Sequence, residues 1–253
     1  MDICKFNVYT INWNESRILP AFLHYYRYAN RIIVYDNEST DNSIELIKAA
    51  RREVITFNTN GKFDDETNII LKNTIWKDAR EDDVDYVIVQ DLDEFLYFPD
   101  YPDDIPSALF EYKKNKITAA ICKGYNMVCS DKKWNDAISK VKEGKNICFS
   151  IKYGFRSDDY DKPILFNPRE IIETNYTIGA HNWSPTGIIK YPSKCPYLLH
   201  YKYIGYRYSL QNALDKASRL SELNIKNGWG IHYTWNQKQR IKEIFKKDRQ
   251  KII

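Results

Sequence analysis

Cysteines, long apolar runs and an excess of one charge are all scarce in this 253-residue sequence. The five cysteines are an odd number without a Cys-x-x-Cys pair, so they indicate neither a disulfide framework nor a zinc ribbon. A reducing compartment fits this usage best. The first residues include no apolar signal segment, and no run approaches the ~20 apolar residues of a membrane-spanning helix. We therefore expect a soluble, cytoplasmic protein that keeps its first residues.

The charge balance is nearly even, with 38 Lys and Arg against 34 Asp and Glu, a net charge of +4. This surplus is too small to predict a nucleic-acid-binding protein. The sequence is 43% hydrophobic and 28% charged, which is typical of globular proteins, and it contains no internal repeat or low-complexity linker. A chain of this length buries roughly three quarters of its unfolded surface, so a sizeable core can form.

Strand-like and helix-like segments alternate through the first third of the chain. Predicted strands are β-branched and apolar, whereas predicted helices show apolar residues at spacings of three and four. The strands are 5–11, 31–35, 54–57 and 86–89; the helices cover the segment around Ile18, Phe22 and Tyr26, the segment from Ile44 and the segment 66–80. This alternation predicts an α/β fold, with a mostly parallel central sheet and helices on both faces.

Ligands of such sheets bind beyond the carboxyl ends of the strands. Here we expect 10–15, 36–41, 58–65 and 91–94 to lie along one edge. The pattern after Asp104, a predicted helix N-cap, is less regular, with strands predicted at 118–123 and 146–151 and a helix at 209–223. We divide the chain into a nucleotide-sugar-binding half (1–104), an acceptor-side half of the same domain (105–234) and a basic C-terminal helix (235–253).

Asp91 and Asp93 follow the fourth predicted strand, two residues apart. Alternate side chains of an extended backbone share a face, so both can point into the cleft. No Lys or Arg occurs from 81 to 104, although a basic partner could come from elsewhere in the fold. Such oxygen ligands suit Mg²⁺ or Mn²⁺, which bind through one or two carboxylates plus substrate phosphates. The alternative is a solvated turn, but its position after a strand favours a site.

Several strings in a fixed order resemble the GT-A glycosyltransferases, within these the family 2 and family 92-like group. The strong resemblance covers about residues 5 to 98, and a weaker one continues to the lysine at 216. The strings are Thr10-Ile-Asn-Trp-Asn-Glu15, Leu19-Pro-Ala-Phe-Leu-His-Tyr-Tyr26, Ile32-Ile-Val-Tyr-Asp36 with the following Asn-Glu-Ser-Thr-Asp41, Asp91-Leu-Asp-Glu-Phe95, Lys162-Pro-Ile164, Gly179-Ala-His181, Leu199-His-Tyr201 and Lys216.

The resemblance implies a GT-A fold and a nucleotide-sugar donor, with UDP as the expected nucleotide. Asp36 would contact the uracil or ribose, and the turn holding Thr10, Asn14 and Glu15 would line the same nucleotide. Asp91 would contact the ribose, or the metal through a water, while Asp93 and His200 would hold the Mn²⁺ or Mg²⁺ directly. Lys162 or Lys216 would assist the leaving diphosphate. The expected acceptor is a glycan or a lipid-linked glycan.

An inverting enzyme of this kind needs a carboxylate that takes the proton of the acceptor hydroxyl. The sequence offers several and does not choose among them. The candidates are Glu94, Asp158, Asp159, Asp161 and Glu170.

Two alternatives remain at this stage. A binding protein that has lost turnover could share the scaffold, although the presence of Glu15, Asp91 and Asp93 speaks against it. A sugar nucleotidyltransferase would be expected to open with a Gly-rich loop, and 10–15 contains no glycine. His181 and His200 also have structural interpretations, as hydrogen-bonded histidines.

The tail 237–251 contains seven basic and two acidic residues around an apolar stripe. One interpretation is a helix that lies on an anionic membrane surface. The other, which we favour, is a solvated helix docked through Ile241, Ile244 and Phe245.

Overall fold

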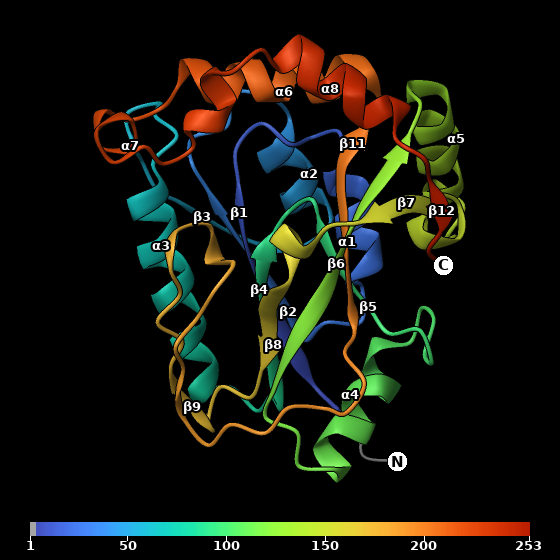
Figure 1. Ribbon diagram of the computed structural model, residues 1–253. Coiled ribbons are helices and arrows are strands. Elements are labelled where there is room, and N and C mark those ends of the chain that lie inside the picture. The colour runs from blue at the N-terminus through green and yellow to red at the C-terminus, as the bar shows by residue number, and fades with distance from the viewer. Residues whose placement is uncertain (1–3) are drawn as a thin grey trace.

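A ten-stranded sheet forms the centre of the molecule in the computed structural model, which describes residues 4–253 (Figure 1). The strand order is β12-β7-β6-β8-β4-β1-β2-β3, and β11 pairs with both β6 and β5. The strands are β1 (Phe6–Asn12), β2 (Arg31–Asp36), β3 (Glu53–Thr56), β4 (Tyr86–Asp91), β5 (Glu94–Tyr97), β6 (Ala119–Cys129), β7 (Tyr153–Arg156), β8 (Lys162–Phe166), β11 (Tyr197–Ile204) and β12 (Gln250–Lys251). A separate pair joins β9 (Ile171–Glu173) to β10 (Thr186–Gly187).

The strands β3, β2, β1 and β4 are parallel neighbours, as the alternation predicts. Because β8 and β7 are antiparallel to their neighbours, β6 and β11 again run in the direction of β1. The register sets Asn12 beside Asp36 and Ile11 beside Asp91. The carboxyl ends of these strands therefore meet at one edge, which confirms the predicted α/β sheet.

Helices cover both faces of the sheet because alternate strand residues point to opposite sides. Val8 and Val34 pack into one apolar cluster with α1 (Leu19–Tyr25), α2 (Ser43–Ala49), α4 (Ile105–Lys114) and α5 (Asp131–Lys142). Tyr9 and Ile33 pack on the other side with α3 (Asp65–Thr74) and η1 (Ile75–Arg80).

The C-terminal segments cross the top of the molecule in Figure 1, in orange and red. They are α6 (Tyr206–Ser218), α7 (Glu222–Asn227), η5 (Ile231–Thr234) and α8 (Gln237–Lys246). α8 docks on α6 through Ile241, Ile244 and Phe245, as the favoured interpretation of the tail predicts. Within residues 4–253 we find no helix with the length and apolarity needed to span a bilayer.

Three predicted elements are wrong in type or extent. The segment 146–151 is a 3-10 turn, η2 (Ile147–Phe149), because the Asn146 side chain accepts a hydrogen bond from the Cys148 backbone at 3.0 Å and closes the chain. The predicted helix 209–223 ends at Ser218, and Ser221 caps a new helix. The C-terminal helix ends at Lys246, and Gln250–Lys251 pair with β7.

Candidate active site

A cavity of about 350 Å³ lies between the carboxyl edge of the parallel strands and the C-terminal segments. Its walls come from the ends of β1 and β4, from α3, from the first residue of β8, from the middle of β11, and from α6 and η5. Asp91, Asp93, Glu94, Lys162, His200 and Lys216 all line it. The fold thus brings together residues that are up to 125 positions apart in the sequence.

Two lysines from other elements neutralise Asp91. Lys72 of α3 contacts Oδ1 at 2.5 Å, and Lys162 of β8 contacts Oδ2 at 3.0 Å. Withdrawal from solvent alone would raise the pKa of the Asp91 carboxyl, but Lys162 and Lys72 hold that pKa well below its usual range. Lys162 also pairs with Glu94 at 2.5 Å. Each oxygen of Asp91 therefore contacts one ammonium group and keeps a second lone pair for a further contact.

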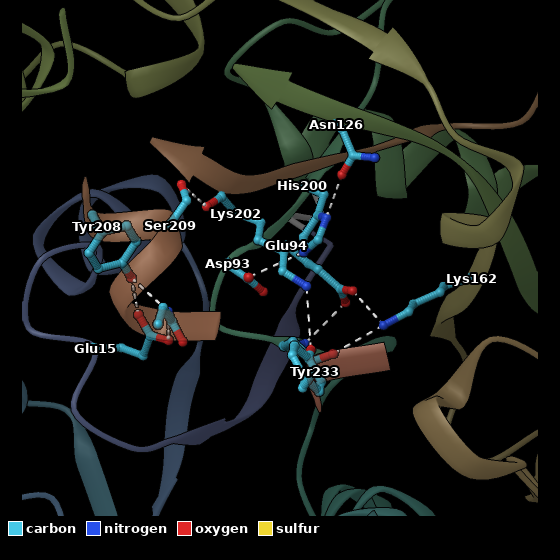
Figure 2. Close-up of polar contacts among 12 residues, drawn as sticks. Glu15, Asp93, Glu94, Asn126, Lys162, His200, Lys202, Tyr208, Ser209 and Tyr233 are labelled. Atoms are coloured by element: carbon cyan, nitrogen blue, oxygen red, sulfur yellow. Dashed lines mark hydrogen bonds and ion pairs between the residues drawn. The ribbon is translucent and has the colours of Figure 1, made fainter. Parts of the chain in front are cut away.

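Asp93 and His200 face one another in the cavity, as Figure 2 shows. His200 Nε2 lies 3.2 Å from Asp93 Oδ2, and His200 Nδ1 lies 2.8 Å from Asn126 Oδ1. Because an amide oxygen only accepts, Nδ1 carries the proton donated to Asn126. Burial alone would raise the pKa of Asp93, but the contact with His200 and the nearby Lys216 lower it below its usual range.

The pair Asp93 and His200 fits a divalent cation. When Nδ1 carries the proton of a neutral imidazole, the lone pair of Nε2 points at Asp93 Oδ2, and the two acceptors repel one another. A proton or a metal ion between Nε2 and Oδ2 would remove this repulsion. His200 Nε2 and Asp93 Oδ2 are close enough that both would bind one ion. Within residues 4–253 no group of three or more His, Cys, Asp or Glu side chains is arranged to hold a metal. Substrate oxygens would have to complete the coordination.

Two further lysines enter the cavity with no carboxylate within ion-pair distance among the described residues. Lys202 of β11 donates to the Tyr233 hydroxyl at 3.3 Å, and the Lys216 ammonium lies 5.9 Å from the centre of the Tyr233 ring. Neither forms a salt bridge within the part of the chain that the structure describes. Burial lowers the pKa of both lysines, but Tyr160 and Tyr233 raise that of Lys202, and Tyr233 and Asp93 raise that of Lys216, so both stay protonated. This is an arrangement that attracts an anion.

Of the residues expected to line the nucleotide on β1, β2 and the turn after β1, only Glu15 lines the cavity. Thr10 and Asp36 are buried, and Asp36 accepts hydrogen bonds from Asn12 and Ser39 at 2.6 Å each. Asn14 binds the turn at Thr40. None of these three lines the cavity. Asp36 and Asn14 order the turn at Ser39 and Thr40, whereas the buried Thr10 hydroxyl has no hydrogen-bond partner among residues 4–253. Their neighbours in sequence, Ile11, Trp13 and Asn37, form the cavity wall.

Glu15 does line the cavity, and its carboxylate is held by α6. Tyr208 donates to Oε2, and Asn212 donates to Oε1 at 3.0 Å. Burial raises the pKa of Glu15, and Asp93 adds to this, while Lys216 opposes it. Glu15 thus joins the β1 turn to the helix that carries Lys216.

The proposed bases are not equivalent in the structure. Asp159 is exposed in η3 (Asp158–Tyr160) and Glu170 precedes β9, and neither lines the cavity. Glu94 does, but it is 1% exposed and paired with Lys162. Asp65, at the start of α3, lines the cavity with one oxygen bound to Asn224 at 2.9 Å. Burial raises its pKa, with a contribution from Asp91, and no cation lies within ion-pair distance among the described residues.

His181 lines the cavity beside Gly179, a position where any other residue would be strained. Gly179 has φ +77°, and a Cβ there would lie 2.6 Å from His181 Cδ2. The imidazole packs edge-on against Tyr160, whose ring lies 4.0 Å from that of His200. Burial and Lys162 lower the pKa of His181 to about 4.

Sequence reasoning missed four residues of the site. They are Asp65, Lys72, Lys202 and Tyr233. Lys202 had a usable signal, because in a strand it shares a face with His200. Asp65 lay within 58–65, which was expected at this edge. Lys72 and Tyr233 arrive through packing of α3 and η5, which no local pattern indicates.

No family model matches this chain, and no curated protein matches it. Among solved structures it is similar to glucosyl-3-phosphoglycerate synthase from Mycobacterium tuberculosis. The complex with Mn²⁺, UDP and glucosyl-3-phosphoglycerate matches at 12% identity and a TM-score of 0.38, over 70% of this chain and 62% of that one. The complex with Mn²⁺, UDP-glucose and phosphoglyceric acid matches at 11% identity and a TM-score of 0.40, also over 70% and 62%. The complex with Mg²⁺ and UDP matches at 12% identity and a TM-score of 0.39, over 70% of this chain and 62% of that one.

Proposed function

We propose that this cavity binds a nucleoside diphosphate sugar, with UDP as the nucleotide, and transfers the sugar to a hydroxyl of a glycan or lipid-linked glycan. The observation that carries the proposal is the pair of lysines, Lys202 and Lys216, which enter the cavity with no carboxylate within ion-pair distance among residues 4–253. A diphosphate would supply the missing negative charge at the edge where α/β sheets bind ligands.

Asp93 and His200 would hold the Mn²⁺ or Mg²⁺, with the diphosphate oxygens completing its coordination. When bound, such an ion supplies Lewis-acid stabilisation of the leaving phosphate. Asn126 fixes the His200 ring so that Nε2 faces the cavity. Lys72 and Lys162 keep Asp91 ionised and in place, so Asp91 is available to accept a hydrogen bond from a ribose hydroxyl in addition to its lysines.

In the reaction the acceptor oxygen forms a bond to the anomeric carbon, and the bond from that carbon to the diphosphate oxygen breaks. The electron pair of the broken bond goes to the diphosphate, where Lys202 and Lys216 stabilise the developing charge. For an inverting reaction the acceptor proton passes to a carboxylate. Asp65 suits this role because one of its oxygens has no hydrogen-bond partner among the described residues, and because burial raises its pKa more than Lys216 and Lys72 lower it.

The proposal is tested by titrating UDP into the protein in the presence of Mn²⁺ and measuring affinity by calorimetry. Lys202→Gln and Lys216→Gln should each weaken UDP binding about 10- to 100-fold, the effect of losing one charge-assisted hydrogen bond. Lys226→Gln, at an exposed lysine of α7, is the matched control and should bind as the unmodified protein does.

A second readout separates an anion site from a structural role. Two neighbouring ammonium groups repel one another when no anion is present, and Lys202 lowers the pKa of Lys216. The tyrosines and carboxylates around the two lysines outweigh this repulsion and raise the pKa of both in the folded chain. Each variant should therefore melt at the same or a lower temperature than the unmodified protein without UDP, and its melting temperature should rise less when UDP is added. A folded protein that shows no affinity for UDP with or without Mn²⁺ would refute the proposed function.

A further inference from the structure

Two side chains contact the imidazole of His200 in different ways. Asn126 accepts a hydrogen bond from Nδ1 at 2.8 Å, and the Tyr160 ring lies against the face of the imidazole, with 4.0 Å between ring centres and 31° between ring planes. A single hydrogen bond tolerates a broad range of angles, so it restrains the plane of the imidazole only loosely. Because the Nε2 lone pair lies in that plane, the plane decides whether Nε2 points at Asp93.

Tyr160 reaches His200 because β6 has a glycine at the point of contact. A Cβ at Gly124 would overlap the backbone carbonyl carbon and oxygen of Tyr160, so any side chain at Gly124 would displace η3. Gly124 and Asn126 are two residues apart on β6 and share a face of the strand. The same strand therefore supplies the hydrogen-bond partner of the imidazole and the space for the ring that stacks on it.

Hydrogen bonds on both sides of Gly124 hold η3 in place. The Gly124 N–H donates to Asp161 Oδ1 at 2.7 Å. The Gly124 carbonyl accepts from the Ser157 N–H at 3.1 Å and from Arg156 Nη1 at 2.8 Å. Arg156 also forms an ion pair with Asp161 at 2.6 Å. The residues before and after Tyr160 are thus tied to β6, which fixes the position of its ring.

We propose that Tyr160 is a positioning residue, whose ring holds the imidazole of His200 in the plane that points Nε2 at Asp93. Contacts around a metal ligand set its orientation, and an aromatic ring stacked on an imidazole does this through its face. The Tyr160 hydroxyl forms no hydrogen bond within residues 4–253, so the ring is the part that acts. The inference rests on the proposed function, in which Asp93 and His200 hold a divalent cation, but the ordering of the imidazole itself needs no metal.

The first test measures the order of the His200 ring by NMR, without metal, in protein labelled with ¹³C-histidine. The order parameter of the Cε1–H bond reports motion on the picosecond-to-nanosecond scale. It should fall in Tyr160→Leu and stay the same in Tyr160→Phe, which keeps the ring. Gly124→Ala should lower it as well, because the added Cβ displaces η3. The chain has four histidines, so His200→Gln identifies the signal.

The second test measures the Mn²⁺ concentration that half-saturates UDP binding, by calorimetry. Tyr160→Leu and Gly124→Ala should each raise it about tenfold, the smaller effect expected for losing an outer partner of a metal ligand. Tyr160→Phe should leave it unchanged. The matched control is Tyr112→Leu, at another half-buried tyrosine, whose ring packs on Phe98 at 5.4 Å and does not line the cavity. This control should leave the Mn²⁺ dependence unchanged even where the melting temperature falls.

An unchanged order parameter in Tyr160→Leu would overturn the proposal, and so would equal losses in Tyr160→Phe and Tyr160→Leu, which would assign the effect to the hydroxyl. A rise in the Mn²⁺ concentration as large in Tyr112→Leu as in Tyr160→Leu would also overturn it, because the effect would then be a general loss of stability. If the unmodified protein binds no UDP in the presence of Mn²⁺, the proposed sugar transfer fails. The order parameter, measured without metal, still decides in that case whether Tyr160 positions His200.

Discussion

At the scale of single residues, Asp65 is the cavity carboxylate best suited to take a proton. Its pKa is raised by burial, and its partner is the neutral amide of Asn224. Asp65→Asn keeps the shape and can still accept from Asn224, so the fold and UDP binding should persist while kcat falls about 10²- to 10⁴-fold. The rate of UDP release in the presence of donor and acceptor measures kcat, and a UDP titration measures the affinity. A variant that loses UDP affinity and keeps kcat would identify Asp65 as a donor contact instead.

Asp93 is a proposed metal ligand, whereas Asn126 contacts the other proposed ligand, His200, and not the metal. Asp93→Asn removes a charged ligand, so the Mn²⁺ concentration that half-saturates UDP binding should rise by more than the roughly 10- to 100-fold that loss of an outer partner costs. Asn126→Ala removes that outer partner of His200 and should fall within the 10- to 100-fold range. Calorimetric titrations of Mn²⁺ at fixed UDP compare the two. Unchanged Mn²⁺ dependence in Asp93→Asn would contradict the assignment.

At the scale of elements, the first residue of α4 could be predicted from the sequence. Asp104 accepts a hydrogen bond from the Ser107 backbone at 3.1 Å, with Pro106 in the first turn, as predicted. Asp104→Ala should lower the free energy of unfolding by about 1 kcal/mol. Because α4 does not contribute to the cavity wall, UDP affinity should stay the same. Urea unfolding and UDP titration check this, and Asp104→Asn, which retains a capping oxygen, should recover most of the stability.

Secondary structure that follows from a local apolar pattern could be predicted from the sequence. Structure and contacts that depend on residues distant in the sequence could not. The parallel strands β1, β2, β3 and β4 follow from their apolar runs, and with them the edge where Asp91 and Asp93 lie. The turn at 146–151 has the apolar residues of a strand, yet it forms a 3-10 turn capped by Asn146, in which Ile147 and Cys148 are buried. The lysines that neutralise Asp91 come from α3 and β8, which only the tertiary structure brings together.

At the scale of the whole molecule, the cavity makes stability depend on pH. Burial and nearby lysines lower the pKa of His181 and His232 to about 4, against about 6.5 in an unfolded chain. Between pH 6.5 and 4 the unfolded chain therefore binds two protons that the folded chain does not, so stability falls as pH falls. The stabilisation is complete above about pH 6.5. Solvent reaches both rings, so each contributes less than the full slope of about 1.4 kcal/mol per pH unit.

The double variant His181→Gln, His232→Gln removes both titrating groups. Its free energy of unfolding in urea should change less between pH 7 and pH 5 than that of the unmodified protein. The comparison isolates these two histidines, because the other groups with a shifted pKa, such as His24, Glu15 and Asp65, are present in both proteins. An equal slope in both proteins would show that these imidazoles titrate alike in the folded and unfolded chains, and that the cavity does not keep them neutral. A flatter slope at an unchanged UDP affinity would place the pH dependence in the cavity wall rather than in the residues that hold the diphosphate.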